Sequence, residues 1–146
     1  MKILLAYDGF ERTRPALEEA ARIAAAEGGS VTALSVVPPD ARATKSGGHV
    51  GFAPHAHEDV ARAHEYLTGQ GIACEMKTDA GDPADCILEE ARRGEYDLVL
   101  TGTHGRGPIA RRLLGSVSHR VADETPCPLL VVAEDSIVRV EPRRAE

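Results

Sequence analysis

The sequence contains no tryptophan, and aromatic residues make up only 3% of its 146 residues. A hydrophobic core in this chain must therefore be built from Ala, Val, Leu and Ile. The chain also lacks an excess of positive charge, because 17 Lys and Arg stand against 23 Asp and Glu, for a formal net charge of −6. A general nucleic-acid-binding protein needs a basic face that displaces counterions. The acidic balance therefore argues against nucleic acid as a partner.

Long apolar runs and paired cysteines are also missing. No run approaches the roughly 20 apolar residues that a helix needs to cross a bilayer, so no membrane partner is expected. The stretch from Met1 to Asp8 is too short and ends too acidic for a secretory signal, and its pattern is that of a strand. The three cysteines, Cys74, Cys86 and Cys127, show no CxxC spacing, which indicates neither a disulfide framework nor a zinc knuckle. We therefore expect a cytoplasmic protein with small buried thiols.

Short apolar runs alternate along the chain with longer segments of helical periodicity. The runs are apolar continuously, which is typical of parallel strands covered on both faces, and strands that alternate with helices form right-handed crossovers. The length suits one domain. We expect an α/β, single-domain open parallel five-stranded sheet flanked by helices on both faces, Rossmann-like and adenine nucleotide alpha-hydrolase-like. The expected strands are Ile3–Tyr7, Val31–Val37, Ile72–Lys77, Leu98–Thr101 and Leu129–Ala133.

Helices are expected between these strands, over residues 15–27, 59–67, 83 to about 94, and 117–124. The third of them has a strong start signal, with Asp82 as N-cap and Pro83 at the first helical position. Residues 38–56 contain three prolines and three glycines without periodicity, and connections of this length are typical of functional lids or mobile segments. The last residues are expected to form a polar, mobile tail, with a short added strand at Ile137, Val138 and Val140 as the alternative.

The stretch that follows the fourth strand carries the clearest chemistry. Residues 101–120 contain four arginines and two histidines but no Asp or Glu. Glycines at 102, 105, 107 and 115 let backbone N–H groups approach a ligand closely, and Ser116 is the expected N-cap of the helix over Val117–Glu124. In parallel sheets ligands bind outside the carboxyl ends of the strands. Backbone donors, a helix N-terminus and arginines at this edge predict an anion site, most naturally for phosphate.

The same stretch resembles a known family. Gly102-Thr103-His104-Gly105, nine further residues and Gly115-Ser116 match the G-x2-G-x9-G-[S/T] motif of the ATP-binding branch of the universal stress protein family. The resemblance runs from Met1 to about Ala133 and includes Gly81-Asp82-Pro83. It implies a universal stress protein domain over residues 1–134 and a C-terminal tail over 135–146.

The resemblance implies an ATP site and assigns roles to its residues. The motif glycines and Ser116 would line the phosphates and ribose, while Asp8 would hydrogen-bond on the nucleoside side. Val36 or Val37 would meet the adenine, and Arg106 is the candidate for the terminal phosphate. Mg²⁺ or Mn²⁺ would bind the phosphates rather than a protein cage. The expected nucleotide-binding residues are Asp8, Val36, Val37, Gly102, His104, Gly105, Arg106, Gly115, Ser116, Val117 and Ser118.

Two observations qualify this site. Phe10 stands where the family usually has the serine of Asp-Gly-Ser, which removes a small hydroxyl near the site. Asp8 has an alternative role as a turn or cap residue, because an Asp after a first strand often serves that purpose.

A metal site at His55 and His57 is disfavoured, since no Cys or carboxylate completes a metal-ligand spacing.

Three classes of function stay open. An ATP-binding regulatory or stress-response module with at most slow hydrolysis is favoured, because an ATPase needs a positioned base or water-orienting group. His104 is the only titratable candidate within the motif, and no catalytic residue is assigned. The alternatives are a genuine ATPase or phosphotransfer enzyme and a nucleotide-independent dimeric scaffold. The resemblance also implies a homodimer in which the last strand, Leu129–Ala133, pairs across a two-fold axis.

Overall fold

A computed structural model gives the fold and describes residues 1–37, 55–103 and 116–143. Its strands form one sheet in the order β3-β2-β1-β4-β5-β6. Strands β1 to β5 are parallel, and β6 is antiparallel to β5. The strands are β1 (Lys2–Ala6), β2 (Ser30–Val37), β3 (Cys74–Ala80), β4 (Leu98–Gly102), β5 (Leu129–Val132) and β6 (Ile137–Val140).

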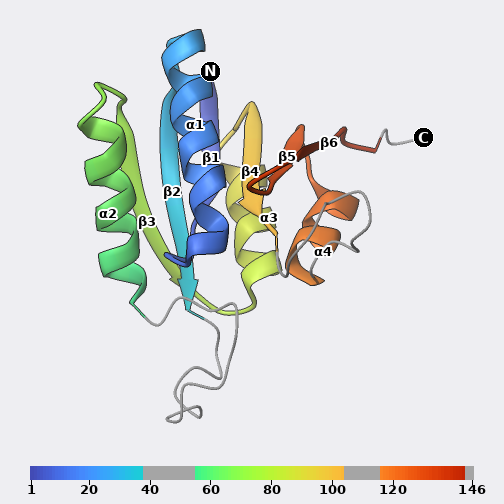
Figure 1. The fold of residues 1–146 in the computed structure, drawn as a ribbon. Helices are drawn as coiled ribbons and strands as arrows, with labels where there is room; N and C mark the ends of the chain where they lie inside the picture. Colours follow the sequence, from blue (N-terminus) through green and yellow to red (C-terminus); the bar gives the residue numbers. More distant parts are fainter. Residues whose placement is uncertain (38–54, 104–115, 144–146) are drawn as a thin grey trace.

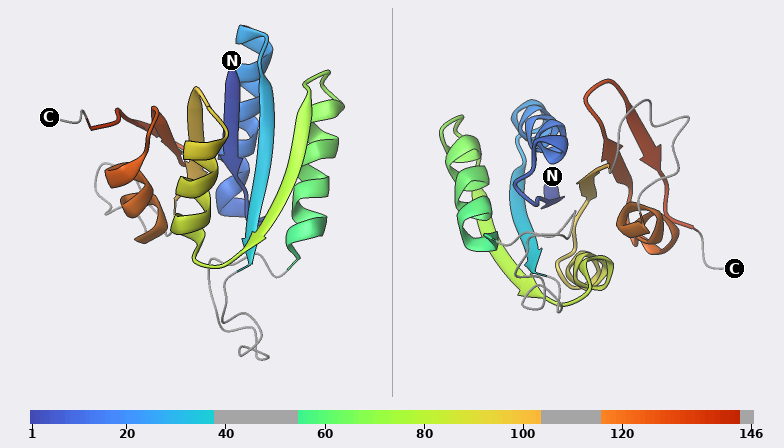
Figure 2. Two further views of the ribbon diagram at one scale, coloured as in Figure 1. Left: turned by 180° about the vertical axis from the view of Figure 1, so that it is seen from behind. Right: turned by 60° about the horizontal axis from the view of Figure 1, so that its bottom comes forward.

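The helices cover both faces of this sheet, so the expected α/β architecture is confirmed. Helices α1 and α2 lie on one face, and α3 and α4 lie on the other (Figures 1 and 2). A single turn of 3₁₀ helix, η1, joins β1 to α1. The helices are η1 (Glu11–Thr13), α1 (Arg14–Glu27), α2 (Ala56–Thr68), α3 (Pro83–Arg93) and α4 (Ser116–Glu124).

Local sequence signals mark where these helices end and begin. Gly28 ends α1 in the left-handed conformation, with φ of 68°. Asp82 caps α3, because its carboxylate accepts a hydrogen bond from the backbone N–H of Asp85 at 3.0 Å, and Pro83 opens the helix. Helix α4 begins at Ser116, one residue before the expected start.

The sheet has six strands rather than the expected five. Residues 137–140 form the short added strand that was the alternative to a mobile tail, because Val138 and Val140 pack against the core while Ile137 and Arg139 face outward. Strand β5 is therefore paired on both sides, with β4 and with β6. The last parallel strand therefore offers no free edge for the expected dimer contact through Leu129–Ala133. On this side of the sheet the edge strand is β6.

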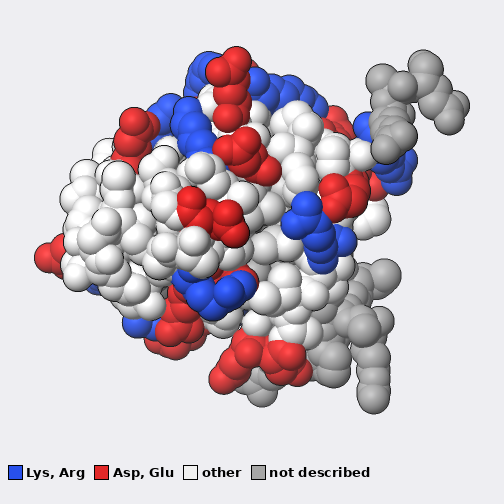
Figure 3. Space-filling view, turned by 90° about the horizontal axis from the view of Figure 1, so that it is seen from above, with Lys and Arg blue, Asp and Glu red and all other residues white. Residues whose placement is uncertain are grey.

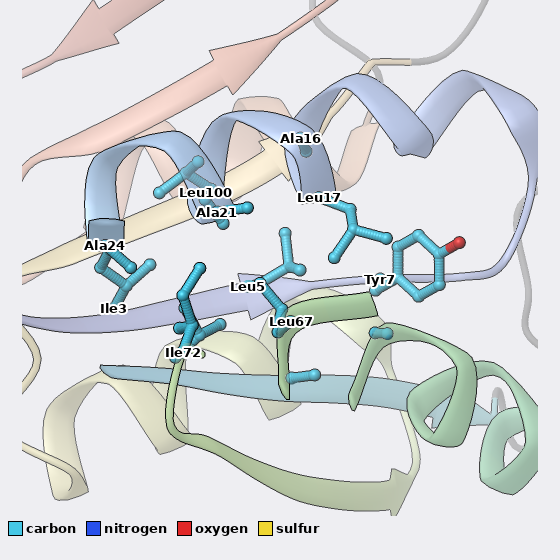
Figure 4. Packing of buried hydrophobic residues seen from close by; sticks show 14 of the residues in the cluster. Ile3, Leu5, Tyr7, Ala16, Leu17, Ala21, Ala24, Leu67, Ile72 and Leu100 are labelled. Atoms are coloured by element: carbon cyan, nitrogen blue, oxygen red, sulfur yellow. The ribbon is translucent and has the colours of Figure 1, made fainter. Parts of the chain in front are cut away.

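The core consists of two clusters, one on each face of the sheet. The first fills the space between the sheet and helices α1 and α2, where small residues such as Ala16, Ala21 and Ala24 bring α1 close to Leu5 and Leu100 (Figure 4). The second lies between the sheet and helices α3 and α4. Two of the three thiols are buried, as expected, and the third is half-buried; all are free.

The edge at the amino ends of the strands carries both signs of charge. Figure 3 shows acidic and basic side chains interspersed there around a broad uncharged area. On the described part of this face no continuous basic surface is present. Within residues 1–37, 55–103 and 116–143, no helix is long and apolar enough to span a membrane.

Candidate functional site

The order of the strands reverses between β1 and β4. From β1 the chain proceeds outward through β2 and β3, and it then returns to place β4 on the other side of β1. The crevice at the carboxyl ends of two such strands is the usual ligand site of open parallel sheets. A cavity with about 550 Å³ of space between atoms, part of it open to solvent, lies there. Its described lining residues are Ala6, Tyr7, Asp8, Arg12, Thr13, Leu34, Val36, Pro83, Ile87, Thr101, Gly102, Thr103, Val117 and Ser118.

The cavity brings together expected site residues from four separate elements of the chain. The end of β1, β2, the end of β4 and the start of α4 each contribute. Ser116 opens α4, but its side chain is not described, and His104, Gly105, Arg106 and Gly115 lie outside the described residues. The expected residues that line the cavity are Asp8, Val36, Gly102, Val117 and Ser118.

The two valines at the end of β2 differ in position. Val36 lines the cavity and is 8% exposed, and it belongs to the second core cluster. Val37 is the next residue, so its side chain points to the opposite face of the sheet, and it is not among the lining residues. Its carbonyl oxygen accepts a hydrogen bond from the N–H of Gly81 at 2.9 Å. Of the two, Val36 is the one that faces the cavity.

Asp8 shapes the turn after β1 and also lines the cavity. One carboxylate oxygen accepts hydrogen bonds from the backbone N–H of Phe10 at 3.0 Å and from the hydroxyl of Thr13 at 2.8 Å, which fixes the turn between β1 and η1. The other oxygen accepts a hydrogen bond from the guanidinium of Arg12 at 3.3 Å. The same side chain lines the cavity. Asp8 is therefore a turn residue whose side chain also forms part of the cavity wall.

Gly102 is needed for packing at the end of β4. A Cβ atom at this position would lie 2.9 Å from Cγ2 and 3.0 Å from Cα of Thr13, both closer than ordinary contact. The glycine therefore lets η1 pack against the end of β4. The hydroxyl of Ser118 on α4 donates to the carbonyl oxygen of Gly102 at 3.4 Å, so this backbone position connects the elements on both sides of the cavity.

Several lining residues were not identified from the sequence, Arg12 and Thr101 among them. The available signal at Thr101 was a polar residue at the end of an otherwise apolar strand. Arg12 gave no such signal, because nothing local shows that η1 folds back over β4. The guanidinium carbon of Arg12 lies 4.7 Å from the centroid of the Phe10 ring, a cation–π contact. The departure from the family at Phe10 thus supplies a partner for Arg12.

Two ionisable groups near the cavity have shifted pKa values. Burial raises the pKa of Tyr7, with Asp59 and Asp8 adding to the rise and Arg14 opposing it. Burial also raises the pKa of Asp59, whose side chain lies against Gly9. The phenol of Tyr7, which lines the cavity, therefore remains protonated and neutral at physiological pH.

The described residues contain no group of three or more His, Cys, Asp or Glu side chains arranged to hold a metal ion. His55 and His57, considered above as a metal pair, are both exposed, and His55 lies 3.8 Å from the carboxylate of Glu58.

Comparison with known proteins gives consistent matches. A family model described as the universal stress protein family matches residues 1–133. A universal stress protein of Thermus aquaticus is 32% identical over 136 residues, covering 89% of this chain and 96% of that protein. The universal stress protein YxiE of Bacillus subtilis is 28% identical over 144 residues, covering 90% and 97%. The crystal structure of a universal stress protein in complex with cAMP is 25% identical, has a TM-score of 0.70, and covers 91% of this chain and 96% of its own.

Proposed function

The chain belongs to the universal stress protein family, and on that premise we propose that it is an ATP-binding regulatory or stress-response module of the cytoplasm. The observation that carries this proposal is the convergence of Asp8, Val36, Gly102, Val117 and Ser118 on one cavity at the reversal of strand order. Residues from four distant parts of the sequence meet where open parallel sheets bind nucleotides.

The composition of the cavity suits a nucleotide. Leu34, Val36 and Ile87 provide apolar surface for a base, and the carboxylate of Asp8 provides hydrogen-bond acceptors for a ribose. The related protein that was crystallised with cAMP supports an adenine nucleotide as the ligand.

We assign the phosphates to the segment between β4 and α4. Gly102, Gly105 and Gly115 would offer backbone N–H groups, the start of α4 at Ser116 adds the positive end of a helix, and Arg106 would meet the terminal phosphate. His104, Val117 and Ser118 adjoin. The carboxylate of Asp8 is already engaged by three donors, so Mg²⁺ or Mn²⁺ would be held by phosphate oxygens and water rather than by this side chain.

Hydrolysis would be slow at most. Of the described lining residues, Tyr7 keeps its proton and Asp8 is held by Arg12 and Thr13, so neither is free to activate water. His104 is the candidate for the alternative, a genuine ATPase or phosphotransfer enzyme. Turnover at an enzymatic rate that is lost in His104→Ala would establish that alternative.

The experiment that tests the binding proposal is mass spectrometry of the nucleotide released from purified protein, together with calorimetric titration of ATP. Gly115→Val should abolish both, because a side chain there would block backbone donation to phosphate, and Gly115→Ala should fall between it and the wild type. Circular dichroism checks that both variants fold. A wild-type protein with neither bound adenine nucleotide nor affinity for ATP contradicts the proposal and favours a nucleotide-independent scaffold. Equal affinity in Gly115→Val contradicts the assigned phosphate site.

A homodimer is part of the same proposal. Because β6 covers the free edge of β5, we propose that two copies meet through the β6 edge, or through β5 once β6 has been displaced. Deletion of residues 135–146, followed by sedimentation analysis, separates these two routes. Loss of the dimer supports the first route, and a retained dimer supports the second.

A further inference from the structure

Two buried polar atoms in the described part of the chain have no hydrogen-bond partner. They are Nε of Arg12 and the hydroxyl oxygen of Thr101. Buried polar groups in folded proteins are almost always paired, so each exception needs a physical explanation. Both residues line the cavity at the reversal of strand order. Their coincidence in one cavity suggests that a ligand supplies the missing partners.

Thr101 is placed deep in this cavity. It is 4% exposed and lies in β4 on the same face of the sheet as Val99, because side chains two residues apart share a face. Val99 belongs to the second core cluster, together with Val36 and Ile87, which also line the cavity. The hydroxyl of Thr101 is therefore a polar group in mainly apolar surroundings. A valine there would fill the same volume without leaving an unpaired hydroxyl.

Arg12 is held in a fixed orientation from two sides. Its terminal nitrogen donates to Asp8 at 3.3 Å, and its guanidinium lies over the ring of Phe10. These contacts use part of the guanidinium and leave the Nε–H without an acceptor. A guanidinium carries five N–H donors in a rigid plane and binds phosphate oxygens well. Because Arg12 is already positioned, little side-chain freedom is lost when an anion binds.

We propose that Arg12 and Thr101 are two further ligand-binding residues of this cavity, with different parts of the ligand as partners. Arg12 donates from Nε to the phosphate attached to the nucleoside. The hydroxyl of Thr101 hydrogen-bonds to the nucleoside itself. The site thereby distinguishes a nucleoside phosphate from the free nucleoside through a residue outside the glycine motif. This inference rests on the proposed function.

The test compares the affinities of adenosine and AMP for the wild type and a small set of variants, measured by calorimetry. Arg12→Gln should weaken AMP about tenfold or more, the expected loss of a charge-assisted hydrogen bond, and should change adenosine affinity much less. Arg12→Lys, which keeps the charge without Nε, should give an intermediate loss. Arg14→Gln is the matched control, because Arg14 is exposed, pairs with Glu18 and does not line the cavity.

Thr101→Val gives the second readout. It should weaken adenosine and AMP by the same factor, about fivefold for one neutral hydrogen bond, while the ligand-free protein melts at the same or a higher temperature. A structural role for Thr101 would instead lower the melting temperature. Thr78→Val, at an exposed position of β3, is the matched control.

The outcomes separate the two proposals. If the wild type binds AMP and Arg12→Gln binds it equally well, or loses adenosine and AMP to the same extent, the contact of Arg12 with phosphate is refuted. Unchanged affinities in Thr101→Val refute the second contact. In both cases the proposed function survives. If the wild type binds neither AMP nor ATP, the proposed function fails, and this inference fails with it.

Discussion

Replacing Glu90 with Gln should destabilise the protein at neutral pH, and the loss should disappear in acid. Glu90 lies on α3 and is 2% exposed. One carboxylate oxygen accepts hydrogen bonds from Nζ of Lys77 at 2.8 Å and from the hydroxyl of Tyr96 at 2.7 Å, and the other accepts one from the guanidinium of Arg93 at 2.7 Å. Burial by itself would raise the pKa of Glu90, but these three donors lower it to about 2.

The size of the effect follows from that pKa. A fall from the ordinary value of 4.5 to about 2 corresponds to about 3 kcal/mol in favour of the charged carboxylate. The side chains of Lys77 and Arg93 are 40% and 70% exposed, so solvent screens part of this attraction. The amide oxygen of Gln also remains available to Tyr96. We therefore expect Glu90→Gln to cost about 2 kcal/mol at neutral pH.

The pH dependence identifies the cause. Since the folded pKa lies below the unfolded one, the stabilisation is complete above 4.5 and is lost as the pH falls toward 2. Urea unfolding of the wild type and Glu90→Gln, followed by circular dichroism from about pH 7 downward, should show two free energies of unfolding that converge below about pH 4.5. Glu89→Gln, the exposed neighbour on α3, should stay within about 0.5 kcal/mol of the wild type. A difference that is constant with pH would refute the electrostatic reasoning and assign the loss to packing.

Three further substitutions test the turn and the glycines around the cavity. Asp59→Asn should raise the melting temperature at neutral pH, because burial raises the pKa of Asp59 and so penalises its charged form. The gain in melting temperature should vanish below pH 3.8, where the carboxyl group is protonated in both the folded and the unfolded protein. Gly9→Ala should lower the free energy of unfolding in urea by about 2 kcal/mol or more, because φ at Gly9 is 80° and the added Cβ would collide with the carboxylate of Asp59. An unchanged stability would mean that this turn is free to rearrange. Gly102→Ala should destabilise the protein by about 1–3 kcal/mol and also weaken ATP binding in calorimetry, because the added Cβ would push η1 away from β4. A loss of stability with unchanged ATP affinity would mean that Gly102 serves packing and not binding.

The sequence predicted the architecture well where its signals were strong, and less well at the edges of the sheet. The strands in the middle are continuous apolar runs, which leave little ambiguity. Strand β3 begins at Cys74 rather than at Ile72, because the N–H of Ile72 bonds back to Leu67 at the end of α2 and its side chain is buried in the first core cluster. Strand β6 has only four residues, and its alternation of apolar and polar residues is weak. Its formation therefore depends on its pairing with β5, which the local sequence does not show.

The candidate site was predictable to the extent that it depends on local pattern. Glycine spacing and the ends of strands located the cavity, and Asp8, Val36 and Gly102 do line it. Arg12 and Thr101 could not be assigned, because their importance comes from contacts across the fold. The approach of η1 to the end of β4 depends on the absence of a side chain at Gly102, and no pattern within residues 8–14 records it.

The electrostatics of the chain explain why such contacts matter. A protein with a net charge of −6 repels an anionic nucleotide at long range, so the proposed function requires that the attraction come from groups placed within the site. Asp8 alone would add to the repulsion. Arg12 offsets this charge through its ion pair with Asp8 at 3.3 Å, and the ring of Phe10 lies against the guanidinium of Arg12. The phenylalanine that departs from the family pattern is therefore best understood as part of this arrangement, because it helps to hold a positive charge beside the carboxylate of Asp8 in the cavity wall.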